Sequence, residues 1–313
     1  MIDEQDQVDS DIDVFEQADT TRLPEQNSQW VTLHSSETLS IEEADRFLRW
    51  REASVVAIIG ERNGGKTTLI AELYNRFLHG AFADALFCHS LSLRGFEKKC
   101  FQSRAESGAL YPDTPRTSAQ DGLSFFHLAI SNVSDLKRQD LLISERAGEV
   151  YREIRDKPHS AAGMIEIRKA SSIVLIIDGE RVAAPRKRHE VFASVRNIIR
   201  ALIDTGNISG QTQIQLVTTK CDLLESDSMV EACEALSRFE QSIVTLIAGQ
   251  FEVIAFRTSA RDPRPGTEPA RGLASLLKSW LKTIPLKTNQ QQKMPELLSE
   301  FDRLALRRNI HEH

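Results

Sequence analysis

A short stretch near residue 60 has the residue types and spacing that hold phosphate groups. In such a stretch, glycines let backbone N–H groups close around a β-phosphate, a lysine neutralises β- and γ-phosphate oxygens, and a threonine hydroxyl ligates Mg²⁺. The chain places these types in the order G-x-x-x-x-G-K-T. We therefore predict a phosphate-binding P-loop. The residues expected to bind are Gly60, Asn63, Gly64, Gly65, Lys66, Thr67 and Thr68.

The flanking residues supply the elements that a P-loop needs. An apolar run, Ser54–Ile59, precedes Gly60, and residues 67–78 continue with the spacing of a helix. In a P-loop, a strand leads into the loop and the N-terminus of a helix directs its N–H groups at the phosphate. Strand, loop and helix follow in this order, which favours the motif over a glycine-rich turn that matches by chance.

A second polar segment has the chemistry to read a nucleotide base. Thr219, Lys220 and Asp222 follow the apolar strand centred on residues 214–217, and open α/β sheets bind ligands at the carboxyl ends of parallel strands. The Asp222 carboxylate can accept hydrogen bonds from N1–H and N2–H₂ of guanine, a pair of donors that adenine lacks. Lys220 would lie along the base plane. The segment predicts a guanine nucleotide, GTP or GDP.

The end of the next strand adds a weaker signal of the same kind. Ser259 and Ala260 can present a backbone N–H to O6 of guanine, and Arg261 follows them. A competing interpretation is a Walker-type ATPase, because an apolar run ends at Asp178, which would bind Mg²⁺ while Glu180 acts as the base. Glu180 is not adjacent to Asp178, which counts against this alternative.

The pattern of apolar residues predicts an α/β fold. Strands at 123–130 and 141–143 are joined as a hairpin, so we expect one antiparallel edge strand in a mostly parallel six-stranded sheet with helices on both faces. Residues 86–88 are a possible further strand. The remaining strands are predicted at 54–59, 172–177, 213–218 and 252–256, and the clearest later helices at 185–202, 229–247 and 273–284.

Composition divides the chain of 313 residues into parts and limits its partners. The net charge of −6 does not favour binding to nucleic acid. The apolar runs are too short to span a membrane, there is no export signal, and the four cysteines lack metal-site spacing, so we expect a cytoplasmic protein. The predicted parts are an acidic disordered leader (1–29), an extension with a short helix capped by Ser40 (30–52), the P-loop domain (53–285, with an insert at 81–121), and a linker with a C-terminal amphipathic helix (286–313).

The three motifs, taken in order, resemble those of TRAFAC-class P-loop GTPases. The resemblance covers residues 53–285 and implies a Ras-like G domain that binds GTP or GDP with Mg²⁺. More closely, Gly95-Phe96-Glu97 followed by Thr114-Pro115-Arg116-Thr117 looks like the bacterial double-GTPase proteins, predicted members of conflict or defence systems. A role in antiviral defence is what that narrower resemblance implies.

The resemblance also assigns roles around the γ-phosphate. Thr117 matches the switch I threonine that binds Mg²⁺, with Thr114 as the alternative. Glu145 begins the segment that corresponds to D-x-x-G, so it would hold a Mg²⁺ ligand, and Gly148 would offer its N–H to the γ-phosphate. Because glutamate replaces aspartate and Mg²⁺ tolerates poor geometry badly, we expect slow hydrolysis.

Further residues near the γ-phosphate carry weaker assignments. Glu149 stands where many GTPases orient the attacking water, and Arg62 and Arg116 are candidate internal arginine fingers. Asn63 matches a pattern found in GTPases that use K⁺. The interpretation we favour is a GTP-binding switch protein that hydrolyses GTP slowly and signals to a partner protein through its switch loops or C-terminal helix. A nucleotide-loaded scaffold with little hydrolysis is the alternative that Glu145 motivates.

Overall fold

The computed structural model describes residues 37–101, 122–261, 268 and 270–282. The leader (1–29) and the C-terminal segment (286–313) lie outside the described residues, as do the candidate switch residues Thr114, Arg116 and Thr117. The P-loop and the predicted base-reading segment lie inside them.

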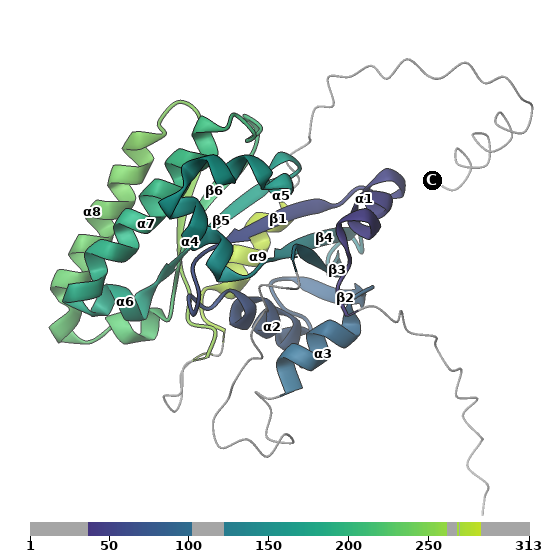
Figure 1. Cartoon of the computed structure of the whole chain (residues 1–313). Helices are drawn as coiled ribbons and strands as arrows, with labels where there is room; N and C mark the ends of the chain where they lie inside the picture. Colours follow the sequence, from purple (N-terminus) through teal and green to yellow (C-terminus); the bar gives the residue numbers. More distant parts are fainter. Residues whose placement is uncertain (1–36, 102–121, 262–267, 269, 283–313) are drawn as a thin grey trace, which may run out of the picture. The chain divides into compact units, whose positions relative to one another are not determined.

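A mixed β-sheet forms the centre of the described part (Figure 1). Its strands are β1 (Ser54–Ile59), β2 (Ala85–His89), β3 (Ser124–Asn132), β4 (Arg138–Glu145), β5 (Ser172–Asp178), β6 (Gln213–Thr219) and β7 (Val253–Arg257). They lie in the order β2-β3-β4-β1-β5-β6-β7. The pairs β4–β1, β1–β5, β5–β6 and β6–β7 are parallel, and β3 runs antiparallel to both its neighbours.

The predicted fold class is confirmed, with two differences in the sheet. It has seven strands instead of six, and the antiparallel strand β3 is second from the edge instead of at the edge. Both differences come from β2, which pairs with β3 on its outer side. Four of the five residues of β2 are exposed, so the sequence lacks the buried alternation that identifies a strand.

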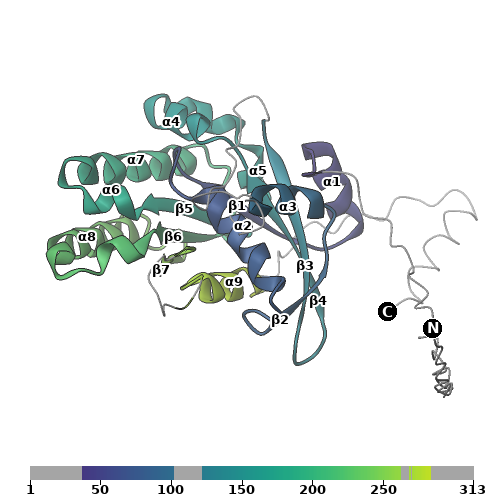
Figure 2. The same ribbon diagram turned by 90° about the horizontal axis from the view of Figure 1, so that it is seen from below.

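Two layers of helices cover the sheet, as Figure 2 shows. One layer packs on Ala57 and Ile59 of β1 and contains α4 (Gly148–Asp156), α5 (Ile165–Arg168), α6 (Gly179–Ala183), α7 (Pro185–Asp204) and α8 (Val230–Leu246). The other packs on Val56 and Ile58 and contains α2 (Lys66–Phe77), α3 (Leu93–Phe101) and α9 (Leu273–Leu281). Neighbouring residues of a strand point to opposite faces, which is why one apolar run serves two cores.

The described part begins with helix α1 (Ile41–Trp50), as the sequence predicts. Its cap is reciprocal, because the Ser40 hydroxyl accepts from the Glu43 N–H at 3.2 Å while the Glu43 carboxylate accepts from the Ser40 N–H at 2.8 Å. Ala44 of α1 packs with Val55 in a small third core. Short 3₁₀ helices lie at Pro158–Gly163, Cys221–Leu224 and Asp227–Met229. Among the described residues, no helix combines the length and apolar character needed to cross a membrane.

Candidate functional site

The P-loop lies between the end of β1 and the start of α2, as its sequence predicts. Gly65 caps α2 with φ of 89°, a left-handed conformation that costs glycine little, and Asn63 also has a positive φ, 62°. A Cβ at Gly60 would lie 2.8 Å from Cβ of Ile176 on β5. The loop therefore rests directly on β5, and the glycine at position 60 is a packing requirement.

Lys66 reaches back across the loop. Its Nζ donates to the carbonyl oxygens of Gly60 at 2.6 Å and Glu61 at 3.0 Å, and it lies 5.5 Å from the centre of the Tyr151 ring. Burial lowers the pKa of Lys66 to about 8, against the opposing effect of nearby carboxylates, the first of them Glu149. A bound phosphate would favour the charged ammonium again.

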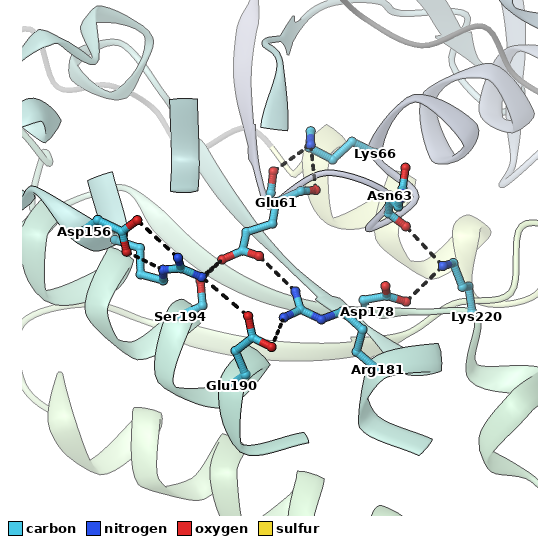
Figure 3. A network of polar contacts seen from close by, with 11 residues as sticks. Glu61, Asn63, Lys66, Asp156, Asp178, Arg181, Glu190, Ser194 and Lys220 are labelled. Carbon is cyan, nitrogen blue, oxygen red and sulfur yellow. Dashed lines mark hydrogen bonds and ion pairs between the residues drawn. The ribbon is translucent and has the colours of Figure 1, made fainter. Parts of the chain in front are cut away.

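The predicted base-reading segment follows β6, which only β5 separates from β1, and it contacts the P-loop. The Thr219 hydroxyl donates to the Gly64 carbonyl at 2.8 Å, and Lys220 Nζ donates to the Asn63 carbonyl at 3.1 Å. Figure 3 shows Lys220 and Asn63 facing each other. These contacts join residues more than 150 positions apart in the sequence. The structure thus brings the phosphate and base motifs together.

Asp222 lies beside the second predicted base contact. The Ser259 hydroxyl donates to Asp222 Oδ1 at 2.7 Å, which orients the carboxylate. The Ser259 N–H donates to the Arg271 carbonyl at 3.0 Å, so of the two backbone N–H groups predicted to contact guanine O6, the one of Ser259 is already used. Arg261 extends towards α2, where its Nε lies 3.9 Å from a carboxylate oxygen of Glu72.

The carboxylates of the alternative Walker B interpretation pair with Lys220. Lys220 Nζ lies 3.1 Å from Asp178 Oδ1 and 2.7 Å from Glu180 Oε2. Asp178 also accepts from the Glu180 N–H at 3.2 Å and so caps α6. Burial disfavours the Lys220 ammonium, but its bonds to Glu180 and Asp178 outweigh this and raise the pKa of Lys220. Asp178 and Glu180 therefore both form ion pairs with Lys220, the lysine that also contacts the Asn63 carbonyl.

Two oxygen ligands of a candidate Mg²⁺ site lie together at the start of α2. The Thr67 hydroxyl donates to Glu145 Oε1 at 3.3 Å, and the Glu145 side chain is 6% exposed. Mg²⁺ binds through hydroxyl and carboxylate oxygens, phosphate oxygens and water. This pair fits such an ion, with the longer glutamate side chain reaching the P-loop threonine.

Gly148 and Glu149 begin helix α4 against the P-loop. A Cβ at Gly148 would lie 2.3 Å from the Arg62 backbone nitrogen, so only glycine allows this approach. Glu149 Oε1 lies 3.6 Å from Arg62 Nε in a solvent-exposed ion pair. Three residues that the sequence assigns to the γ-phosphate region are thus neighbours.

Glu61 is a site residue that sequence reasoning missed. Its carboxylate accepts from Arg155 of α4 at 3.0 Å, Arg181 of α6 at 2.9 Å and Ser194 of α7 at 2.5 Å. Figure 3 shows Arg181 and Ser194 facing the Glu61 carboxylate, with Glu190 on the other side of the Arg181 guanidinium. Burial opposes the charge, but the bonds from Ser194 and Arg181 outweigh it and lower the pKa of Glu61. Glu61 occupies a variable position of the P-loop pattern, so no motif could have indicated this role.

Replacing Glu61 by alanine is expected to destabilise the protein. The change removes an acceptor that the partly buried Arg155 and Arg181 share, which should lower the free energy of unfolding by about 2 kcal/mol. Urea unfolding measures this. The control is Glu234→Ala, which removes an exposed pair with Arg238 on α8 and should cost less than about 1 kcal/mol. Equal losses in the two variants would contradict the anchoring role.

Comparison with known proteins identifies the family. The sequence profile of the Double-GTPase 2 family matches residues 54–281, while no curated protein matches the chain. Among solved structures, the chain is similar to the signal recognition particle receptor SRb-GTP/SRX complex from Chaetomium thermophilum, with 12% identity, a TM-score of 0.42, and coverage of 73% of this chain and 99% of that one. It is also similar to Roco2 RocCORdC from Methanosarcina barkeri bound to GDP, with 15% identity, a TM-score of 0.36, and coverage of 75% and 50%.

The family match extends from β1 to the end of α9. It therefore includes the P-loop, the segment around Asp222 and the strand that leads to Ser259, the parts that the fold brings into contact. The chain belongs to the Double-GTPase 2 family and is a GTP-binding protein.

Proposed function

We propose that the protein binds GTP through the P-loop and the Asp222 segment and hydrolyses it slowly to GDP and phosphate. The observation that carries the proposal is the direct contact between the two motifs, in which Lys220 Nζ lies 3.1 Å from the Asn63 carbonyl. A phosphate cradle and a guanine-reading carboxylate joined in this way can hold the two ends of one nucleotide. Contact between Ser259 and Asp222 supports the same assignment, because it fixes one carboxylate oxygen.

Each residue near the phosphates has a distinct task in this proposal. Lys66 binds β- and γ-phosphate oxygens once they replace the carbonyls that it now contacts, and the N–H groups at the start of α2 complete the cradle. Thr67 and Glu145 would hold Mg²⁺, which supplies positive charge to the phosphates when bound. Gly148 would offer its N–H to the γ-phosphate, as the family resemblance implies.

The attack of water is assigned to the region around Glu149. Glu149 can orient a water molecule or accept its proton, and its ion pair with Arg62 keeps it beside the P-loop. Arg62 and, from sequence, Arg116 are the candidates for stabilising the developing charge. Thr117, with Thr114 as the alternative, is the candidate switch I threonine that would bind Mg²⁺. Use of K⁺ through Asn63 stays a prediction.

Glu145 favours a second candidate function, a nucleotide-loaded scaffold with little hydrolysis. Its carboxylate stands where the family pattern has aspartate, and the longer side chain already contacts Thr67. Either way we propose that the bound nucleotide controls a surface for a partner protein, with bacterial defence as the setting that the resemblance suggests.

The nucleotide that stabilises the protein tests the proposal. A ligand that binds the folded state raises stability by RT ln(1 + [L]/Kd). We expect GTP and GDP to raise the melting temperature by several degrees at about 1 mM, and ATP and ADP to have little effect. A larger shift with ATP would refute guanine recognition. Single-turnover hydrolysis of bound GTP then separates a slow GTPase from a scaffold.

A further inference from the structure

A lysine from outside the known motifs reaches the candidate Mg²⁺ site. Lys99 Nζ lies 3.4 Å from Glu145 Oε1, the same oxygen that accepts from the Thr67 hydroxyl. The lysine side chain is 14% exposed and the glutamate side chain 6%. An ammonium, a carboxylate and a hydroxyl thus form one compact cluster at the start of α2.

Helix α3 holds Lys99 firmly in this place. Phe96 stacks on Tyr74 of α2 with ring centres 4.8 Å apart, and the Cys100 thiol contacts the Ala71 carbonyl at 3.2 Å. The Tyr74 hydroxyl donates to the Glu97 carboxylate at 2.5 Å. These contacts lie on both sides of Lys99 along the helix. The lysine is therefore presented by a packed element and its approach to Glu145 is part of the fold.

The position of Lys99 has an electrostatic consequence for a divalent ion. A metal bound by Glu145 would stand within a few ångströms of the ammonium, and like charges in a partly buried site repel. In the absence of the metal, the ammonium neutralises a carboxylate that would otherwise repel nucleotide phosphates. Lys99 thus weakens metal binding at Glu145. When no metal is bound, its ammonium supplies part of the positive charge that the metal would bring.

We propose that Lys99 is a built-in counter-cation of Glu145, which Mg²⁺ must displace from the carboxylate to bind. The inference rests on the proposed function, because the metal arrives with a guanine nucleotide. It makes GDP binding by the native protein only weakly dependent on Mg²⁺. It also makes Lys99 a positioning residue for Glu145.

Lys99→Met tests the proposal through the stabilisation of the protein by GDP. In EDTA, the variant should lose most of the rise in melting temperature that GDP gives the native protein, because Glu145 then repels the phosphates. In a Mg²⁺ titration with GDP present, the Mg²⁺ concentration that gives half-maximal stabilisation should be about tenfold lower for Lys99→Met than for the native protein. This is the size of effect expected from one hydrogen bond to a charged group. Lys99→Arg should behave like the native protein.

A neighbouring lysine supplies the matched control. Lys98 pairs with Glu37 at the surface, with side chains 60% and 48% exposed, so Lys98→Met should leave the Mg²⁺ dependence unchanged. If Lys99→Met does not fold, Lys99→Gln keeps a polar group at the same position and carries the same expectation. When Glu145 is already replaced by glutamine, adding Lys99→Met should not change the Mg²⁺ dependence of stabilisation by GDP any further.

The same measurements distinguish failure of the Lys99 proposal from failure of the proposed function. If GDP stabilises every variant with the same Mg²⁺ dependence, the role of Lys99 is refuted and the proposed function stands. If GDP and GTP stabilise neither the native protein nor any variant, with or without Mg²⁺, the proposed function itself fails.

Discussion

Replacing Asp222 by asparagine is expected to transfer base preference from guanosine to xanthosine nucleotides. The carboxylate accepts two N–H donors of guanine, whereas an asparagine amide offers one acceptor and one donor, which suits the extra carbonyl of xanthine. Loss of hydrogen bonds to a charged group should weaken GDP binding by about 100-fold. Competition between GDP and XDP, measured by calorimetry, gives both affinities.

The local structure makes Asp222→Asn an interpretable change. The Ser259 hydroxyl donates to Asp222 Oδ1, and the asparagine carbonyl oxygen can accept the same bond. Asp227 provides the control, because it is an exposed carboxylate on the next 3₁₀ helix. Asp227→Asn should keep the guanosine preference. If Asp222→Asn also keeps it, Asp222 does not read the base.

Replacing Gly148 by alanine is expected to be the most damaging single-atom addition at the site. The new Cβ would lie 2.3 Å from the nitrogen and 2.6 Å from the Cα of Arg62, and 2.6 Å from the carbonyl carbon of Glu61. These are backbone atoms, which cannot move aside as a side chain can. We expect overpacking to lower the free energy of unfolding by about 3 kcal/mol and to displace the P-loop, so that GDP affinity also falls about 100-fold.

Gly163 gives a matched control for this substitution. A Cβ there meets no atom within 4 Å, so Gly163→Ala should leave stability unchanged to within about 0.5 kcal/mol. Urea unfolding and GDP titration of both variants decide the matter. Native-like stability and affinity in Gly148→Ala would mean that α4 can move away from the P-loop at little cost.

Gly148→Ala acts on the P-loop, which is supported from several sides. Ile176 of β5 lies under Gly60, Lys220 and Thr219 contact its middle, and Gly148 abuts it from α4. The Glu61 carboxylate adds anchors to α6 and α7. The conformation of the loop is therefore a property of the whole sheet and not of the glycine-rich sequence alone.

Sequence predicted the parts of the fold whose signal is local. The apolar runs of β5 and β6 are buried along their whole length, and a pattern of that kind needs no partner to be recognised. The cap of α1 at Ser40 is likewise a contact over three residues. By contrast, β2 has mostly exposed side chains, and only its pairing with β3 makes it a strand.

The same division holds for the site. Residue types and spacing alone predicted the P-loop, the base-reading role of Asp222 and a guanine nucleotide, because phosphate and base binding use short segments with characteristic chemistry. Tertiary structure alone decided that Glu61 anchors the loop, that Lys220 pairs with Asp178, and that Lys99 reaches Glu145. These pairs join residues from 42 to 120 positions apart, and an ion pair between distant segments leaves no periodic trace in the sequence. Its partners are fixed only when the sheet brings these segments together.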